Sequence, residues 1–138
     1  MFFKKNKDEN ENENLIKISA LLIHAAKIDQ DFSHKEVEII KQTLLKIGAK
    51  NEDLKKIIEN AKKVEEDSNQ ILNFTKEVKN MDEENKIKII EALWQIIYSN
   101  NEADIYETSL MRRLGGLLYI DSKTMGDIKS KIKEKKPQ

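Results

Sequence analysis

The chain has 138 residues, with 25 basic and 25 acidic side chains and hence a formal net charge of zero. This length suits a single domain, and the absence of cysteine excludes disulfides, cysteine-ligated zinc and a thiol nucleophile. One proline and four glycines argue against an all-β fold, which needs frequent turn residues.

The N-terminal part of the chain divides into a polar segment and an apolar one. Residues 1–14 contain alternating glutamate and asparagine with no apolar period, which predicts a disordered segment. Residues 15–28 are apolar except for one stripe of Lys17, His24 and Lys27, which predicts a central helix touching solvent along a single line. His24 is therefore expected to be a half-exposed surface histidine.

Six further helices are predicted, each with an apolar face. Polar residues that can cap a helix mark their starts: Ser33, Asn51, Asp67 or Ser68, Asp82, Asp104, and Asp121 or Ser122. The expected inward residues are Val37, Ile40, Leu44, Ile47, Leu54, Ile57, Ile58, Ala61, Val64, Ile71, Phe74, Thr75, Val78, Ile90, Leu93, Trp94, Ile97, Tyr98, Leu110, Leu114, Leu117, Leu118, Met125, Ile128 and Ile132. Gly48 is the natural stop of the second helix. The predicted fold is an all-α single domain of about seven helices over residues 15–130, followed by a basic tail, residues 131–138.

Two segments of the chain resemble each other at an offset of 71 residues. Residues 20–36 and 91–107 both read as an apolar helix, a short polar loop and the start of a new helix. The pattern predicts two similar helix–loop–helix halves related by a pseudo-twofold arrangement.

Oxygen-bearing side chains gather at the two matching loops, which raises the possibility of a shared cation site. They are Asp29, Asp31, Glu36, Asn100, Glu102, Asp104 and Glu107. Hard cations such as calcium, magnesium or manganese prefer oxygen ligands. A purely structural role is open as well, because Ser33 with Glu36, and Asp104 with Glu107, have the spacing of helix capping boxes.

Neither loop fits the EF-hand template for calcium. Numbered from Asp29 or Asn100, the sixth position is His34 or Ile105, where glycine is needed. The twelfth position is likewise not the required glutamate. Any shared site would therefore have to form between the two loops.

These motifs resemble the TerB family of tellurite-resistance proteins and are similar to the N-terminal domain of the DjlA co-chaperones. The family pattern is an apolar helix ending in Ala-Asp-Gly, two or three polar residues, and a helix opening with glutamate. Here it corresponds to Ile28-Asp29-Gln30 with Glu36, and to Ser99-Asn100-Asn101 with Glu107. The match is closest over residues 82–118, which include Leu93-Trp94 and Arg112-Arg113.

The resemblance implies an all-helical domain, an association with stress response or tellurite resistance, and an acidic metal-binding surface. The departures from the family pattern weaken that surface. Gln30 and Asn101 replace the family glycines, and Asn100 replaces an aspartate, which removes one charge. Any cation site here should therefore be weaker than in a typical member.

The sequence favours a non-enzymatic cytoplasmic module that binds a divalent cation or an unidentified protein partner through the acidic loops. The alternative is a metal-free helical adaptor for protein interactions. No phosphate loop, nucleophile elbow or histidine metal motif supports an enzyme. Only two basic residues are arginines, which argues against nucleic-acid binding, and no apolar segment has bilayer length, which argues against stable membrane insertion.

Overall fold

The computed structural model describes residues 7–27, 34–68, 72–99 and 105–135. Over these ranges the chain is helical with no strand, which confirms the all-α prediction. The elements are α1 (Lys7–Lys27), α2 (His34–Lys46), the 3-10 helix η1 (Asn51–Asp53), α3 (Leu54–Glu66), α4 (Leu72–Lys79), α5 (Glu83–Tyr98), α6 (Ile105–Leu117) and α7 (Ser122–Lys135).

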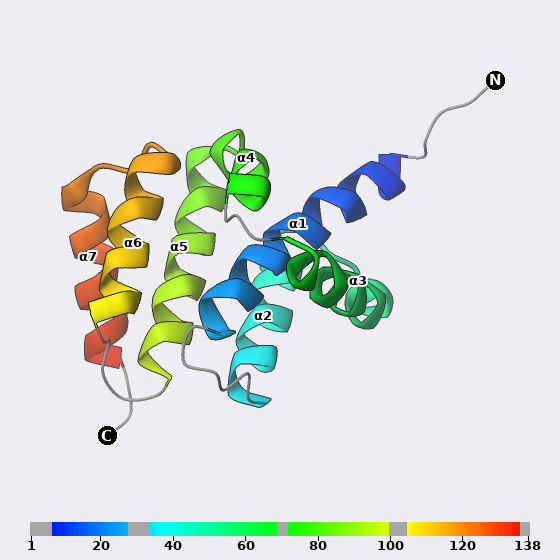
Figure 1. Cartoon of the computed structure of the whole chain (residues 1–138), viewed down its shortest axis with the longest axis horizontal. Helices are drawn as coiled ribbons and strands as arrows, with labels where there is room; N and C mark the ends of the chain where they lie inside the picture. The colour runs from blue at the N-terminus through cyan, green and yellow to red at the C-terminus, as the bar shows by residue number, and fades with distance from the viewer. Residues whose placement is uncertain (1–6, 28–33, 69–71, 100–104, 136–138) are drawn as a thin grey trace.

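Helix α1 is the central element of the N-terminal part of the domain (Figure 1). It packs chiefly against α3 and α4 and also touches α2 and α5. Its apolar side chains are buried nearly all round, while Lys17, His24 and Lys27 reach solvent to different degrees. The sequence prediction of a helix exposed along one stripe is therefore confirmed.

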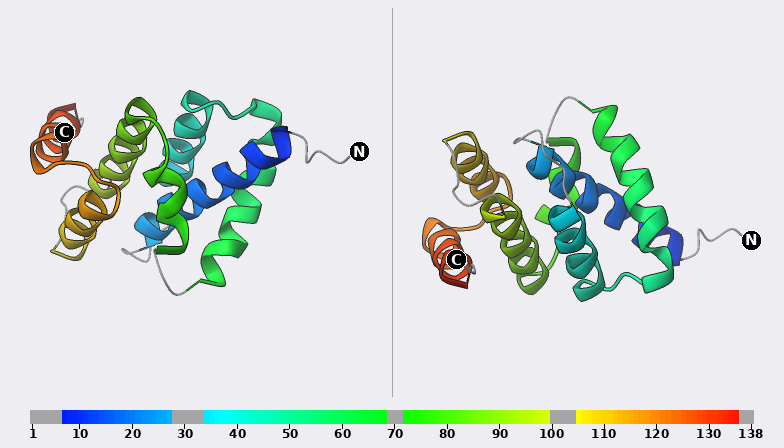
Figure 2. Two further views of the ribbon diagram at one scale, coloured as in Figure 1. Left: turned by 90° about the horizontal axis from the view of Figure 1, so that it is seen from above. Right: turned by 90° about the horizontal axis from the view of Figure 1, so that it is seen from below.

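Helix α5 joins this part to the C-terminal helices. It packs against α2 on one side and α7 on another, and the two views in Figure 2 show it between these helices. Its apolar stripe, including Ile90, Leu93 and Trp94, is buried in one continuous core with the residues of α1. The domain therefore has a single core. The predicted pseudo-twofold relation between its halves stays a prediction.

Several helix ends are formed as the sequence predicts. The Asp82 carboxylate accepts the backbone amide of Asn85 at 2.9 Å and caps α5. Asp121 does the same for α7 with the Thr124 amide at 2.7 Å, and this hydrogen bond lowers the pKa of Asp121. Gly48 ends α2 with a φ of 112°, in the left-handed region that favours glycine.

Two expected boundaries differ from the structure. Helix α1 begins at Lys7, so residues 7–14 are helical and not disordered as expected; residues 1–6 lie outside the described part. Lysine and glutamate are good helix formers, and extending an existing helix costs far less than nucleating one. The expected basic tail 131–138 is helical through Lys135, and Ile132 lies in the core.

The third helix begins later than expected. Asn51 opens the 3-10 helix, and α3 starts only at Leu54, with no side-chain cap from Asp53. Asp67 is the C-cap of α3 and not the start of α4. Helix α4 is described from Leu72, after residues 69–71, which lie outside the described part, so Ser68 as its start stays a prediction. Val64 was expected to be buried but is 37% exposed, because the next residue of α3, Glu65, takes the inward position.

The turn after α6 carries an unusual residue. Tyr119 has a φ of 58°, and the amides of Tyr119 and Ile120 bond back to the carbonyls of Gly116 and Gly115. This is the helix-ending geometry that glycine normally provides. A tyrosine there places its Cβ against the backbone. The residue is 71% exposed, and its ring lies beneath the ammonium of Lys79.

We expect Tyr119→Gly to raise the free energy of unfolding by about 0.5–1 kcal/mol, because glycine adopts this φ without strain. Urea denaturation followed by circular dichroism measures the change. Tyr119→Ala is the matched control, since it removes the contact with Lys79 but keeps the strain. Equal stabilities for the two variants would contradict the explanation.

Candidate functional site

The helix ends that flank the two matching loops face the same side of the molecule. In Figure 1 these are the end of α1, the start of α2, the end of α5 and the start of α6, all at the lower edge. Direct packing of α2 against α5 brings one end from each repeat together. The two loops predicted to form a shared site are therefore attached to one face of the domain.

A hydrogen bond links α2 to the end of α5 at this face. Glu36, in the first turn of α2, is only 1% exposed, and its Oε2 lies 3.2 Å from the Oγ of Ser99, which follows α5. The same hydroxyl lies 2.6 Å from the Ile96 carbonyl, so its one proton is shared between two acceptors. Glu36 is thus a buried carboxylate at the junction of α2 with the end of α5, which we call the acidic junction.

The side chains of the other predicted ligands are not among those that the structure describes. Glu107 lies in α6, but nothing is described of its side chain. The remaining predictions lie outside the described residues: Asp29, Asp31, Asn100, Glu102 and Asp104. Ser33, the expected capping partner of Glu36, lies outside them as well. In the part of the chain that is described, no group of three or more potential metal-ligating side chains comes together.

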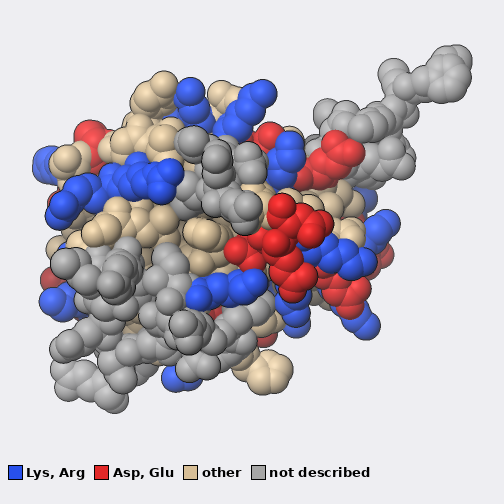
Figure 3. All heavy atoms as spheres, in the orientation of Figure 1, with Lys and Arg blue, Asp and Glu red and all other residues tan. Residues whose placement is uncertain are grey.

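A second buried carboxylate ties α1 to α3, and sequence reasoning missed it. Glu65 is 8% exposed; its Oε1 accepts from Lys27 Nζ at 2.7 Å, and its Oε2 lies 3.2 Å from His24 Nδ1. On the face shown in Figure 3, acidic side chains gather over α3. His24 is half-buried, as the sequence predicted, and contacts this carboxylate.

Two opposing effects set the pKa of Glu65. Burial alone raises it, and this is the largest single contribution. The hydrogen bonds from Lys27 and His24, with the charges of these groups, lower it by more in sum, so the pKa lies below its ordinary value. The hydrogen bond between Lys27 and Glu65 also raises the pKa of Lys27. Both shifts favour the charged pair, which identifies a structural ion pair between two helices.

Sequence reasoning also missed Lys86 of α5 as a buried cation. Its side chain is buried, and its ammonium donates to the Leu118 carbonyl at 3.1 Å, where the last turn of α6 ends. A cation is favourable at a helix C-terminus. Each missed residue gave a signal: Glu65 falls four residues after Ala61, and Lys86 four before Ile90, so both occupy apolar helix faces.

The aromatic pair of α5 lies in the core, as expected. Trp94 and Tyr98 are buried and stack with their ring centroids 5.9 Å apart. No helix among the described residues is long and apolar enough to cross a membrane.

Together, these observations define a small all-helical domain with a buried acidic junction between α2 and the end of α5. The family model of Tellurite resistance protein TerB matches residues 15–130, and the chain belongs to this family. No curated protein and no solved structure is similar enough to give a match. The family resemblance read from the sequence is confirmed.

Proposed function

We propose that this TerB-family chain is a non-enzymatic cytoplasmic module associated with stress response or tellurite resistance. Its working surface is the face that carries the two repeat loops. There it binds a divalent cation, or an accessory protein, through the acidic side chains of both loops. The observation that carries this proposal is the buried Glu36 carboxylate hydrogen-bonded to Ser99 across the two repeats.

Burying a carboxylate is costly unless hydrogen bonds or a cation compensate for its lost hydration. Glu36 gains some compensation from the first turn of α2, where the helix dipole favours negative charge. Because Ser99 directly precedes Asn100 and Glu36 lies in the first turn of α2, the hydrogen bond joins the two helix ends from which the loops extend. Carboxylates carried on loops that extend from joined helix ends could share one hard cation.

The test is calorimetric titration of the protein with Ca²⁺, Mg²⁺ and Mn²⁺, beside the double variant Asp29→Asn, Glu102→Gln. We expect saturable binding by the unmodified protein and at least about a tenfold loss of affinity in the variant, since each substitution removes a charged oxygen ligand. The control is Glu83→Gln, Glu84→Gln, which makes the same charge change at exposed positions of α5 far along the helix from Ser99.

Equal affinity in the loop variant and the control would place the cation elsewhere. Absence of binding at millimolar metal would favour the second candidate, a metal-free adaptor whose acidic face docks a protein. In that case the same loop variant should lose a partner that the control retains.

A further inference from the structure

A groove of about 610 Å³ lies between α6 and α7, and its lining includes neither Glu36 nor Ser99 of the acidic junction. Its floor is α5, against which α7 packs, whereas α6 packs against α4. Glycines line the groove where the two outer helices face each other: Gly115, Gly116 and Gly126. A Cβ at Gly116 or Gly126 would meet no atom within 4 Å, so close helix packing does not explain these two glycines. They leave open space in the groove.

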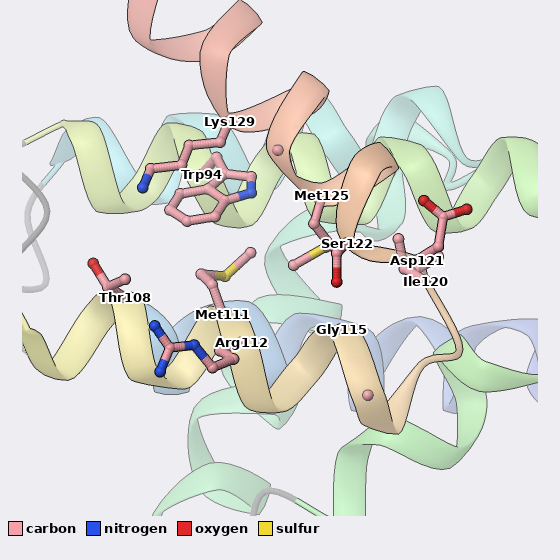
Figure 4. A pocket seen from close by; sticks show the side chains of 12 residues that line it. Trp94, Thr108, Met111, Arg112, Gly115, Ile120, Asp121, Ser122, Met125 and Lys129 are labelled. Atoms are coloured by element: carbon pink, nitrogen blue, oxygen red, sulfur yellow. The ribbon is translucent and has the colours of Figure 1, made fainter.

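The floor and inner walls of the groove are apolar, and their methionine side chains are flexible and polarizable. Figure 4 shows the Trp94 indole between α6 and α7, with the thioethers of Met111 and Met125 on opposite sides beside it. Thioether sulfurs make favourable contacts with aromatic ring edges, and methionine side chains adapt to the shape of a ligand. This lining suits a flat aromatic body.

The Trp94 indole nitrogen is an unsatisfied donor at this floor. The residue is 3% exposed, and within the described part of the chain its Nε1 has no hydrogen-bond partner. Buried indole N–H groups usually find an acceptor, because leaving one unpaired costs about 1–3 kcal/mol. In Figure 4 this nitrogen lies on the side of Met125. It is covered by its neighbours, so it serves as a reporter of changes beside the groove and not as a contact of the ligand.

The charges around the groove favour an anionic ligand. Lys129 lies over the Trp94 ring, with its Nζ 5.3 Å from the ring centroid, and Arg112 stands on the opposite wall. Asp121, the acidic residue of the lining, sits at the far end and is engaged as the cap of α7. A carboxylate between Lys129 and Arg112 would therefore meet two cations, and an arginine can bind it with two parallel hydrogen bonds.

We propose that the groove between α6 and α7 binds a small aromatic carboxylate. Its carboxylate accepts from Arg112 and lies beside the ammonium of Lys129. Its ring lies between Met111 and Met125 and extends into the space left by Gly126. A volume of about 610 Å³ falls within the range of small-molecule pockets, about 300–1,000 Å³. This site is independent of the acidic junction and of any cation bound there.

The test uses the single tryptophan of the chain, which gives one indole N–H signal in a two-dimensional nitrogen–proton NMR spectrum. The protein is titrated with 1-naphthoate and, separately, with 1-naphthalenemethanol, which has the same ring system without the charge. We expect 1-naphthoate to shift the indole signal saturably and to bind at least about tenfold more tightly than the alcohol, which corresponds to about 1.4 kcal/mol. Equal affinity for both probes, or no shift of the indole signal at millimolar naphthoate, would overturn the proposal.

Neighbouring arginines provide a matched pair of variants. Arg112 lines the groove and Arg113 does not, although both are exposed on α6. Arg112→Gln should raise the dissociation constant of 1-naphthoate at least about fivefold by removing a charge-assisted hydrogen bond, while Arg113→Gln should leave it within about twofold. The same loss in both variants would mean nonspecific attraction and would refute the site.

Filling the groove gives a test that does not depend on charge. Gly126→Leu places a side chain in open space and replaces a helix-interior glycine, so the variant should fold at least as stably as the unmodified protein. It should nevertheless lose 1-naphthoate binding by at least about tenfold. A variant that melts at or above the normal temperature and still binds normally would place the ligand outside this groove.

Discussion

Phe74→Ala is expected to lower the free energy of unfolding by about 3–5 kcal/mol, the usual cost of removing a buried aromatic ring. Phe74 is 2% exposed and belongs to α4, a helix of only eight residues. So short a helix is not stable alone and depends on its packing against α1. Domains have only about 5–15 kcal/mol of stability in total, so this variant should approach unfolding.

Urea denaturation followed by circular dichroism measures this loss. Lys76→Ala changes an exposed residue of the same helix and should alter stability by less than about 0.5 kcal/mol. Phe74→Leu keeps part of the buried volume and should fall between the two. A loss below about 1 kcal/mol for Phe74→Ala would mean that α4 contributes little to the core.

Glu65→Gln should cost about 1.5–3 kcal/mol at neutral pH, because it removes the negative charge that accepts hydrogen bonds from Lys27 and His24. Lys27 and His24 are partly exposed, so water compensates them in the variant and the cost stays below that of breaking a fully buried pair. The control is Glu66→Gln, an exposed neighbour that removes the same charge and should be nearly neutral.

The cost of Glu65→Gln should also depend on pH. The pKa of Glu65 is lower in the folded chain than in the unfolded chain, so its stabilising effect is complete above the unfolded pKa. That effect is lost as pH falls through the folded value. The stability difference between the unmodified protein and Glu65→Gln should therefore shrink only as pH falls below about 5, and should keep shrinking as pH falls through the lowered folded pKa. A difference that stays constant or grows over that range would contradict the assigned pKa direction.

Local signals in the sequence predicted much of the fold. Gly48 ends α2, and Asp82 and Asp121 cap α5 and α7, because each of these features depends on residues at most a few positions away. The early start of α1 was missed for a related reason: apolar periodicity marks the buried part of a helix, and residues 7–14 extend α1 beyond that part. Helix existence was therefore more predictable than helix length.

The candidate sites were less predictable, because their partners are distant in sequence. Glu36 was identified from its loop motif, but its contact with Ser99 joins residues 63 positions apart. Glu65 and Lys86 were missed because a charge on an apolar helix face does not identify its partner on another helix. The groove at Trp94 could not be foreseen either, since the aromatic stripe of α5 indicated a core position and not what α6 and α7 leave uncovered.

The glycines of α6 and α7 have a consequence for local opening of the backbone. Each glycine inside a helix weakens it by about 1 kcal/mol relative to alanine, and α6 carries two of them near its end while α7 carries one. Amide hydrogens in these turns should therefore exchange with solvent through partial unfolding, well before the buried turns of α1 and α5. A compound that occupies the groove would slow this exchange, so the two helices serve as a built-in reporter of occupancy.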